Sequence, residues 1–188
     1  ESHHFPLLAE HIRHKQDPVT IWCSAASTGE EPYSIAMTLL ETLGAKASQA
    51  KVIATDIDTD ALAKARKGIY PQEQVRKLDE ARVKRFFQKG TGNHIGLARV
   101  RPEVSALVEF MPLNLLAPQW PIKGPFDAIF CRNVMIYFDK ETQAKILKRF
   151  APLMKQDGLL FAGHSENFSY ISDAFKLRGQ TVYTLANK

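Results

Sequence analysis

The sequence predicts an α/β fold in which a parallel β-sheet carries helices on both faces. Two observations predict it: strand-like and helix-like segments alternate along most of the 188 residues, and polar clusters directly follow several of the strand-like runs. The composition, 45% hydrophobic and 24% charged, is ordinary for a globular domain. A chain of this length can form one domain with a small insertion and bury a core without disulfides or metal.

A turn of small residues separates the first strand from the first predicted helix. Val19–Cys23 predicts a buried strand, and Ser24–Gly29 a turn that lets the backbone approach a ligand closely. Pro32 lies in the first turn of the helix, where a missing N–H is harmless, and Gly44 is placed to end it. The apolar positions of this helix recur at helical spacing, at Ile35, Ala36, Leu39, Leu40 and Leu43.

The alternation continues to the end of the chain. The further predicted strands are Val52–Thr55, Val108–Met111, Phe126–Cys131, Gly158–Ala162 and Thr181–Leu185. A helix over Asp60–Lys67 follows a cap at Asp58 or Thr59 and ends at Gly68, and Asp139 caps another helix. The stretch 86–108 breaks the rhythm, and its glycines and short apolar runs predict a small antiparallel insertion before the third strand.

Charge and cysteine content limit the possible partners and compartments. The formal net charge of +5 allows nucleic acid, but the basic residues are spread along the chain without interleaved aromatic residues. A solvated surface, or one that steers an acidic protein partner, is therefore favoured. Cys23 and Cys131 stand in apolar runs and indicate buried thiols in a reducing cytosol. No membrane-spanning run and no signal-peptide layout is present.

Ligands of such sheets bind at the carboxyl ends of the strands, so the residues there are candidates. Glu30 and Glu31 begin the first helix, where two carboxylates repel a pyrophosphate and favour a cationic ligand, unless they only stabilise the helix terminus. Asp56 ends the second strand and suits ribose hydroxyls, with capping of the next turn as the alternative. Asn114 suits either an adenine edge or a turn.

Two polar clusters follow the fourth and fifth predicted strands. Arg132 and Asn133 stand between two apolar runs and are expected to face a ligand, whereas Tyr137 offers a phenol at the same mouth or packs there. Gly163–Phe168 is expected to be a hydrogen-bonded loop that shapes the pocket wall. The histidines near the start of the chain lack partners that would complete a metal site, so solvated or capping roles are expected for His3, His4, His11 and His14.

Taken together, these motifs resemble the CheR family of chemotaxis receptor methyltransferases. The matching segments, in order and at family spacing, are Ser27–Ser34, Asp56–Asp58, Phe126–Asp139 and Gly158–Phe168. The resemblance implies the class I S-adenosylmethionine-dependent methyltransferase fold, a Rossmann-like, seven-stranded sheet whose last strand is antiparallel. It also implies that residues 1–188 form the catalytic domain, that residues 86–108 are an inserted β-subdomain, and that the family's N-terminal helical domain is absent from this chain.

The resemblance further implies a site for S-adenosylmethionine, with S-adenosylhomocysteine as the product. The implied cofactor-binding residues are Glu31, Asp56, Asn114, Leu115, Cys131, Arg132 and Asn133, and the implied catalytic residue, near the transferred methyl group, is Tyr137. The family's Thr-x-Phe-Phe-Arg motif, whose arginine orients the substrate carboxylate, is expected immediately before Glu1.

The implied partners are the cytoplasmic domain of a bacterial chemoreceptor, whose glutamates are esterified, and its C-terminal pentapeptide. The residues that resemble a basic, glycine-rich peptide-binding loop are Lys89, Gly90, Gly92, Gly96 and Arg99. Hairpin turns are the alternative for these glycines. A cytoplasmic monomer without a nucleic-acid partner or membrane insertion is expected. Two rival interpretations stay open: a nucleic-acid methyltransferase, which would need a base-flipping pocket, and a cofactor-binding or receptor-docking fragment without activity.

Overall fold

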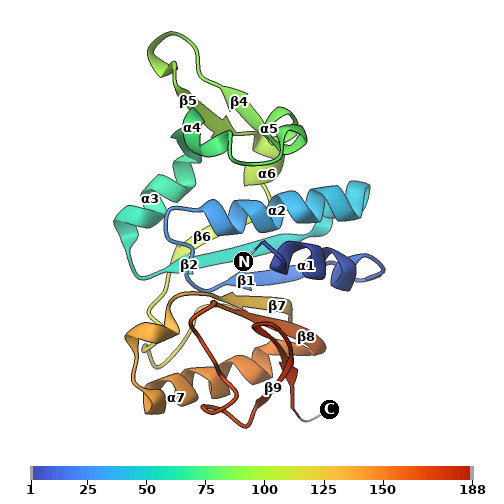
Figure 1. The fold of residues 1–188 in the computed structure, drawn as a ribbon, viewed down its shortest axis with the longest axis vertical. Helices are drawn as coiled ribbons and strands as arrows, with labels where there is room; N and C mark the ends of the chain where they lie inside the picture. Colours follow the sequence, from blue (N-terminus) through green and yellow to red (C-terminus); the bar gives the residue numbers. More distant parts are fainter. Residues whose placement is uncertain (1, 187–188) are drawn as a thin grey trace.

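The computed structural model describes residues 2–186 and is built around one seven-stranded sheet (Figure 1). In spatial order its strands are β6 (Val108–Pro112), β2 (Lys51–Asp56), β1 (Thr20–Cys23), β7 (Phe126–Cys131), β8 (Met154–Ala162), β10 (Val182–Leu185) and β9 (Phe175–Gly179). The first five run parallel, and β10 is antiparallel to both of its neighbours. The predicted fold class, including the antiparallel last strand, is confirmed.

Strict alternation along the strands divides the interior into two hydrophobic cores. In β1, Ile21 and Cys23 point into one core, and Trp22 points into the other. In β7, Phe130 and Ile129 divide in the same way. Because side chains of a strand alternate between faces, a strand that is apolar at every position must be covered on both sides. All six residues of β7, five of them apolar, are accordingly buried.

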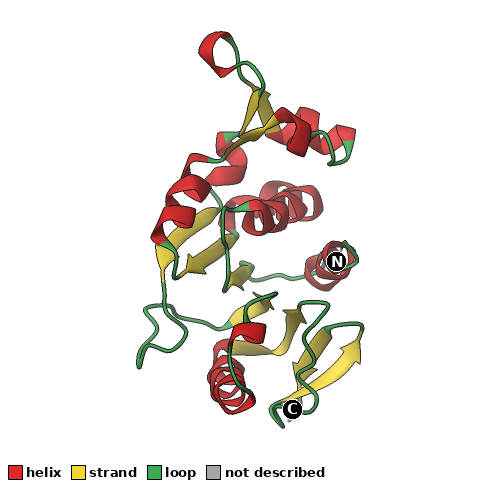
Figure 2. Ribbon diagram, turned by 60° about the vertical axis from the view of Figure 1, so that its left-hand side comes forward, coloured by secondary structure: helices red, strands yellow, loops and turns green. Residues whose placement is uncertain are grey.

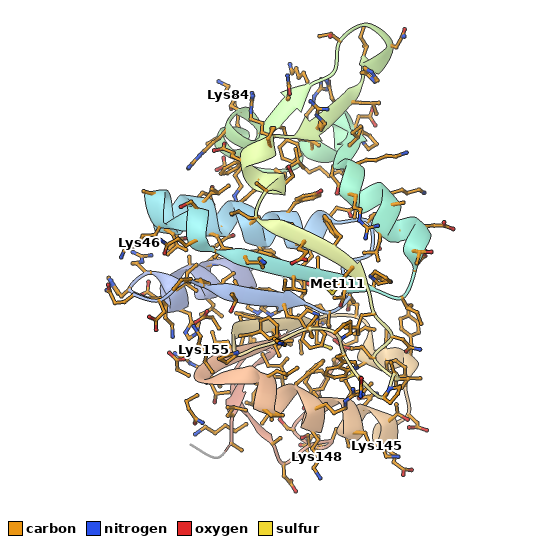
Figure 3. The ribbon with its side chains drawn as sticks, turned by 180° about the vertical axis from the view of Figure 1, so that it is seen from behind. Lys46, Lys84, Met111, Lys145, Lys148 and Lys155 are labelled. Carbon is orange, nitrogen blue, oxygen red and sulfur yellow. The ribbon has the colours of Figure 1, made fainter. Side chains whose placement is uncertain are left out.

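Helices cover the two faces unequally. Residues of α1 (His4–Ile12) and α2 (Glu30–Leu43) belong to the first core, and residues of α7 (Lys140–Phe150) belong to the second. The other long helix is α3 (Thr59–Lys67), and the 3-10 helices of the main domain are η1 (Gly44–Gln49), η3 (Met135–Tyr137) and η4 (Ala151–Leu153). Seen from behind, Lys145 and Lys148 mark α7 at one end of the molecule (Figure 3).

Side-chain caps begin two of the helices as predicted. The Asp58 carboxylate accepts hydrogen bonds from the backbone N–H groups of Asp60 and Ala61, and so caps α3. Asp139 caps α7 by accepting from the N–H of Thr142. Gly44 ends α2, but the chain continues directly into η1, which the sequence pattern did not indicate.

The insertion is larger than the sequence predicted. A three-stranded antiparallel sheet, β3 (Ile69–Pro71), β5 (Leu97–Val100) and β4 (Phe87–Lys89), begins at Ile69 rather than at residue 86. It is accompanied by α4 (Gln72–Val75), α5 (Glu80–Phe86), η2 (Gly92–His94) and α6 (Pro102–Ser105). Three residues of β3 are too few to show a strand pattern, so only pairing with β5 identifies them. The insertion lies at the far end from α7, and its β4–β5 hairpin projects outward (Figure 2).

His4, in α1, does not have the solvated or capping role that was expected for the histidines near the start of the chain. The His4 side chain is fully buried, with its ring 4.9 Å from that of Phe161. Its Nε2 lies 2.8 Å from the Thr181 hydroxyl, which itself donates to the carbonyl of Gln180, so Nε2 carries the proton and donates. Among the described residues, Nδ1 has no partner. His4 is therefore a core residue rather than a solvated one, and burial together with the nearby Arg132 lowers its pKa to about 3.

A buried carboxylate anchors the end of the sheet where β7 begins. Asp127 is inaccessible to solvent, and its oxygens lie 3.0 and 3.1 Å from Nζ of Lys155. It also accepts from the backbone N–H of Thr20, and Lys15 lies 3.8 Å away. This cluster joins the segment after α1 to β1, β7 and β8, at the end of the sheet opposite the strands' carboxyl ends. None of the described helices has the length and apolarity needed to span a bilayer.

Candidate cofactor site

The carboxyl ends of four strands converge on a small hollow. It has a volume of about 70 Å³ and is lined by Ser24, Ala25, Asp56, Ile57, Leu113, Asn114, Leu115, Val134 and Phe138. These residues follow β1, β2, β6 and β7. The strand order reverses beside β1, which pairs with β2 on one side and β7 on the other. Open α/β sheets bind ligands at such a point.

Hydrogen bonds from residues of β1 and β2 hold the loop between β1 and α2. The Trp22 indole donates to the Thr55 hydroxyl, which donates to the Ser24 carbonyl, and the N–H of Ala26 donates to the carbonyl of Thr55. Gly29 ends the loop with φ 102°, in the left-handed region. A Cβ on Gly29 would lie 2.8 Å from the Tyr70 hydroxyl oxygen, so only glycine fits.

Asp56 caps the turn that follows β2, which was the alternative to a ligand role. One of its oxygens accepts from the N–H of Ser27 at 2.8 Å, and the other accepts from the N–H of Asp58 at 2.9 Å. It thereby joins the end of β2 to the loop after β1. Each carboxylate oxygen has a second lone pair, and the side chain lines the hollow, so Asp56 can still accept from a ligand.

Glu31 and Arg132, both predicted to bind the cofactor, lie together. Nε of Arg132 is 3.1 Å from a Glu31 carboxylate oxygen, in an ion pair whose two side chains are 15% and 18% exposed. The Cys23 thiol donates to the other Glu31 oxygen. Burial, followed by this carboxylate, raises the pKa of Cys23 well above its ordinary value. Nη1 of Arg132 is buried and has no hydrogen-bond partner among the described residues.

Asn114 and Leu115 lie in a loop that a side chain of α7 holds in place. The Asn114 side chain accepts from the N–H of Leu116, so it stabilises a turn, and its residue remains exposed beside the hollow. Arg149, from α7, donates to the carbonyls of Leu115 and Ala117 and lies 3.8 Å above the Trp120 ring. Sequence reasoning missed Arg149, because nothing local distinguishes it from other basic residues of a solvated helix face.

The loop after β7 presents its candidates in different ways. The Cys131 thiol is completely buried in the second core, and the residue is not among those that line the hollow. Burial also raises its pKa. Asn133 is exposed and adopts a left-handed backbone with φ 62°, and the Tyr137 side chain is 79% exposed.

The predicted peptide-binding residues gather on the insertion. Lys89 and Arg99 are exposed on β4 and β5, and with Gly90 they line a second hollow of about 240 Å³. Gly92 and Gly96 have φ of 58° and 90° inside the connecting hairpin, which agrees with the turn alternative for the glycines.

Basic charge is concentrated on the insertion. Residues 69–101, the part of the insertion before α6, contain eight Lys and Arg against three Asp and Glu, a net of +5 that equals the formal charge of the whole chain. With α6, which adds Glu103, the net charge of the insertion is +4. Basic residues do occur along the whole chain, but the excess of basic over acidic residues lies in this stretch. Lys84, on α5, marks this end of the molecule (Figure 3). Within residues 2–186, no three His, Cys, Asp or Glu side chains are grouped as a metal site.

This strand order, with an antiparallel last strand and an acidic residue at the end of β2, defines the class I S-adenosylmethionine-dependent methyltransferases. Residues 1–184 match the family model described as CheR methyltransferase, SAM binding domain. The chain belongs to this family, whose cofactor is S-adenosylmethionine.

Named relatives agree with this membership. The chain is 61% identical over 186 residues to a chemotaxis protein methyltransferase of Escherichia coli, covering 99% of this chain and 65% of the relative. It is 61% identical to that of Klebsiella aerogenes, covering 100% and 65%. The chain thus spans slightly less than two thirds of these relatives. Among solved structures, the plantazolicin methyltransferase BpumL in complex with SAH aligns with 84% of this chain and 44% of its own, at 13% identity and a TM-score of 0.45.

Proposed function

We propose that the hollow at the carboxyl ends of β1, β2, β6 and β7 binds S-adenosylmethionine, and that the whole protein transfers its methyl group to glutamate carboxylates of chemoreceptors. The observation that carries the proposal is the position of Asp56, at the end of β2 and on the wall of the hollow, in a chain of this family. The cytoplasm is the proposed compartment.

The described residues fit the parts of this cofactor. Apolar side chains and Asn114 suit an adenine ring, and Asp56 suits the ribose hydroxyls. Glu31, near the same loop, suits a cationic ammonium group. The unpartnered Nη1 of Arg132 can donate to a carboxylate, because a buried donor without a partner is unfavourable and a ligand can satisfy it.

The acceptor chemistry explains why the site needs no strong base. When bound, S-adenosylmethionine supplies an electrophilic methyl group. A glutamate side chain titrates near 4.3, so it reaches the site already ionised at neutral pH. The protein then has to align the acceptor and exclude water, and alignment alone can contribute roughly 7–11 kcal/mol. Tyr137 is proposed to lie beside the transferred methyl group, where its exposed side chain can meet an acceptor.

Asp56→Ala is expected to weaken the binding of S-adenosylhomocysteine by about 1–3 kcal/mol, through the lost ribose contact and the loosened loop. Asp58→Ala is the matched control, since Asp58 also accepts two backbone N–H groups but serves only α3. Calorimetry on both folded variants measures the difference. Equal affinities for the two variants would remove Asp56 from the site.

The same variants test the reaction in the full-length protein. Transfer of a labelled methyl group is expected to receptor, and Asp56→Ala should reduce it more than Asp58→Ala does. Label in DNA or RNA would support the nucleic-acid rival instead. Cofactor binding without transfer to any acceptor would support a binding or docking protein without activity.

We also propose that the insertion binds an acidic pentapeptide at the end of the receptor. The support is the net +5 charge of residues 69–101 and the exposed Arg99 beside the second hollow. Strand addition supplies affinity in this binding mode, and charge pairing adds to it. The protein is proposed to be a monomer without a nucleic-acid partner.

Arg99→Ala is expected to weaken binding of an acidic, aromatic pentapeptide by roughly 1–3 kcal/mol and to reduce its salt dependence. Lys84→Ala, which removes an exposed charge from α5, is the control and should change little. Titration of the free peptide at two salt concentrations measures both effects. Equal losses in the two variants would show a general charge effect, and no saturable binding to the wild type would exclude this partner site.

A further inference from the structure

A buried carboxylate outside the predicted site residues holds the loop after β7. Glu166 is only 6% exposed, and its two oxygens accept three backbone hydrogen bonds. One oxygen accepts from the N–H of Asn133 at 2.9 Å and from the N–H of Gly163 at 2.7 Å. The other accepts from the N–H of Met135 at 2.8 Å. Both oxygens of the side chain are thus bound to backbone groups.

These bonds join two loops that follow neighbouring parallel strands. Gly163 and Glu166 follow β8, whereas Asn133 and Met135 follow β7. The Glu166 N–H also donates to the Gly163 carbonyl, so the turn after β8 is closed on itself. A Cβ on Gly163 would lie 2.6 Å from the Asn133 side-chain oxygen and 2.7 Å from a Glu166 oxygen. The two loops therefore approach as closely as glycine allows.

The clamped segment is the one that carries the proposed site residues. Asn133 has a left-handed backbone, which asparagine adopts more readily than most residues and which surrounding contacts can fix. Met135 begins η3, which ends at Tyr137. Glu166 accepts hydrogen bonds from the N–H groups of the residues on either side of Val134. These bonds fix the backbone that orients the Asn133 and Tyr137 side chains.

A carboxylate is the appropriate group for this task. Three N–H donors converge on it, and hydrogen bonds to a charged acceptor are about twice as strong as neutral ones. They also offset the cost of burying the charge. An amide of the same shape has one acceptor oxygen and would place its own N–H₂ group against a backbone N–H.

We propose that Glu166 is a positioning residue for cofactor binding and methyl transfer, acting through the backbone of residues 133–135. The inference rests on the proposed function, because it assigns Glu166 a role in the same site. Glu166 itself does not touch the reacting atoms. Its effect is to hold Asn133 and Tyr137 in the geometry that the ligand requires.

The test compares Glu166→Gln with Tyr183→Phe. The Tyr183 hydroxyl accepts from the N–H of Phe168 at 3.0 Å, so Tyr183→Phe loosens the other end of the same loop without releasing Asn133 or Met135. Glu166→Gln is expected to weaken S-adenosylhomocysteine binding roughly tenfold or more, whereas Tyr183→Phe should stay within about twofold of the wild type. In the full-length enzyme, Glu166→Gln should raise KM for S-adenosylmethionine and lower kcat, with KM for the receptor unchanged.

Amide hydrogen exchange separates this inference from the proposed function. Peptides covering residues 131–137 should exchange faster in Glu166→Gln, with the core strands unchanged, and should not do so in Tyr183→Phe. If the wild type binds no cofactor, both the proposed function and this role are overturned, although the exchange data still show what orders the loop. If Glu166→Gln binds as well as the wild type, or no worse than Tyr183→Phe, only the positioning role is overturned. Should Glu166→Gln fail to fold, Glu166→Asp replaces it, with an intermediate loss expected and an unchanged affinity contradicting the role.

Discussion

Gly29→Ala is expected to lower the free energy of unfolding by about 2–4 kcal/mol and to abolish most cofactor binding. At φ 102° a residue with a Cβ is strained by roughly 1–3 kcal/mol. The new Cβ would also lie 2.8 Å from the Tyr70 hydroxyl oxygen and 3.0 Å from Cβ of Ala65, and such overpacking costs roughly 1–3 kcal/mol. The loop that contains Gly29 would have to move, and with it the backbone that Asp56 holds.

Gly44→Ala separates the two causes of this loss. Gly44 also has a positive φ, 57°, but a Cβ there would meet nothing within 4 Å. Urea unfolding of both variants should show the larger loss for Gly29→Ala, and only that variant should lose affinity for S-adenosylhomocysteine. Equal losses would mean that the contact with Tyr70 relaxes freely and that backbone strain alone acts.

Acidification from pH 7 to pH 5 is expected to destabilise the protein by about 2 kcal/mol through His4. The pKa of His4 is about 3 in the folded protein and 6.5 without burial. Below pH 6.5 the imidazole of His4 therefore binds a proton in the unfolded chain but not in the folded protein. The contribution of His4 to the free energy of unfolding has its full value above pH 6.5. It falls by roughly 1.4 kcal/mol per pH unit as the pH decreases towards 3.

His4→Phe is the variant that checks this dependence. It keeps an aromatic ring against Phe161, and the Thr181 hydroxyl retains its bond to the Gln180 carbonyl. Denaturant unfolding at several pH values should give a slope for His4→Phe that is smaller by up to one proton. His11 contributes to the remaining slope in this range, because burial lowers its pKa as well. An unchanged slope would show that His4 takes up its proton without leaving the core.

The fold was predictable where sequence pattern and structure share a local cause. β7 was predicted with its observed bounds because an apolar run between turn residues leaves few alternatives. The caps at Asp58 and Asp139 were predicted for the same reason, since a cap contacts only the next turn. By contrast, β3 pairs with β5, which is distant in sequence, and β9 is mostly exposed, so these short segments gave no pattern.

The candidate site residues could be proposed from local pattern, whereas the groups that hold them could not. Asp56 and Glu31 were proposed from their places after a strand and at a helix start, which is local information. Glu166 was expected only as part of a loop, because its bonds to Asn133 and Met135 exist only when β7 and β8 are neighbours. Arg149 was missed for the same reason, as its carbonyl partners lie more than 30 residues away.

The hydroxyl of Tyr70 has a consequence for protein engineering. It donates to the Thr28 carbonyl at 2.8 Å, and nearby the Gln74 amide donates to Glu30, so β3 and α4 support the loop between β1 and α2. Residues of the insertion and of α2 also share one hydrophobic core. Excision of residues 69–101 would therefore remove the Tyr70 contact that supports the loop ending at Gly29. The same holds for a chimera that exchanges these residues between relatives to change receptor choice. Such a graft has to carry Tyr70 with it, or fuse the foreign segment after Pro71.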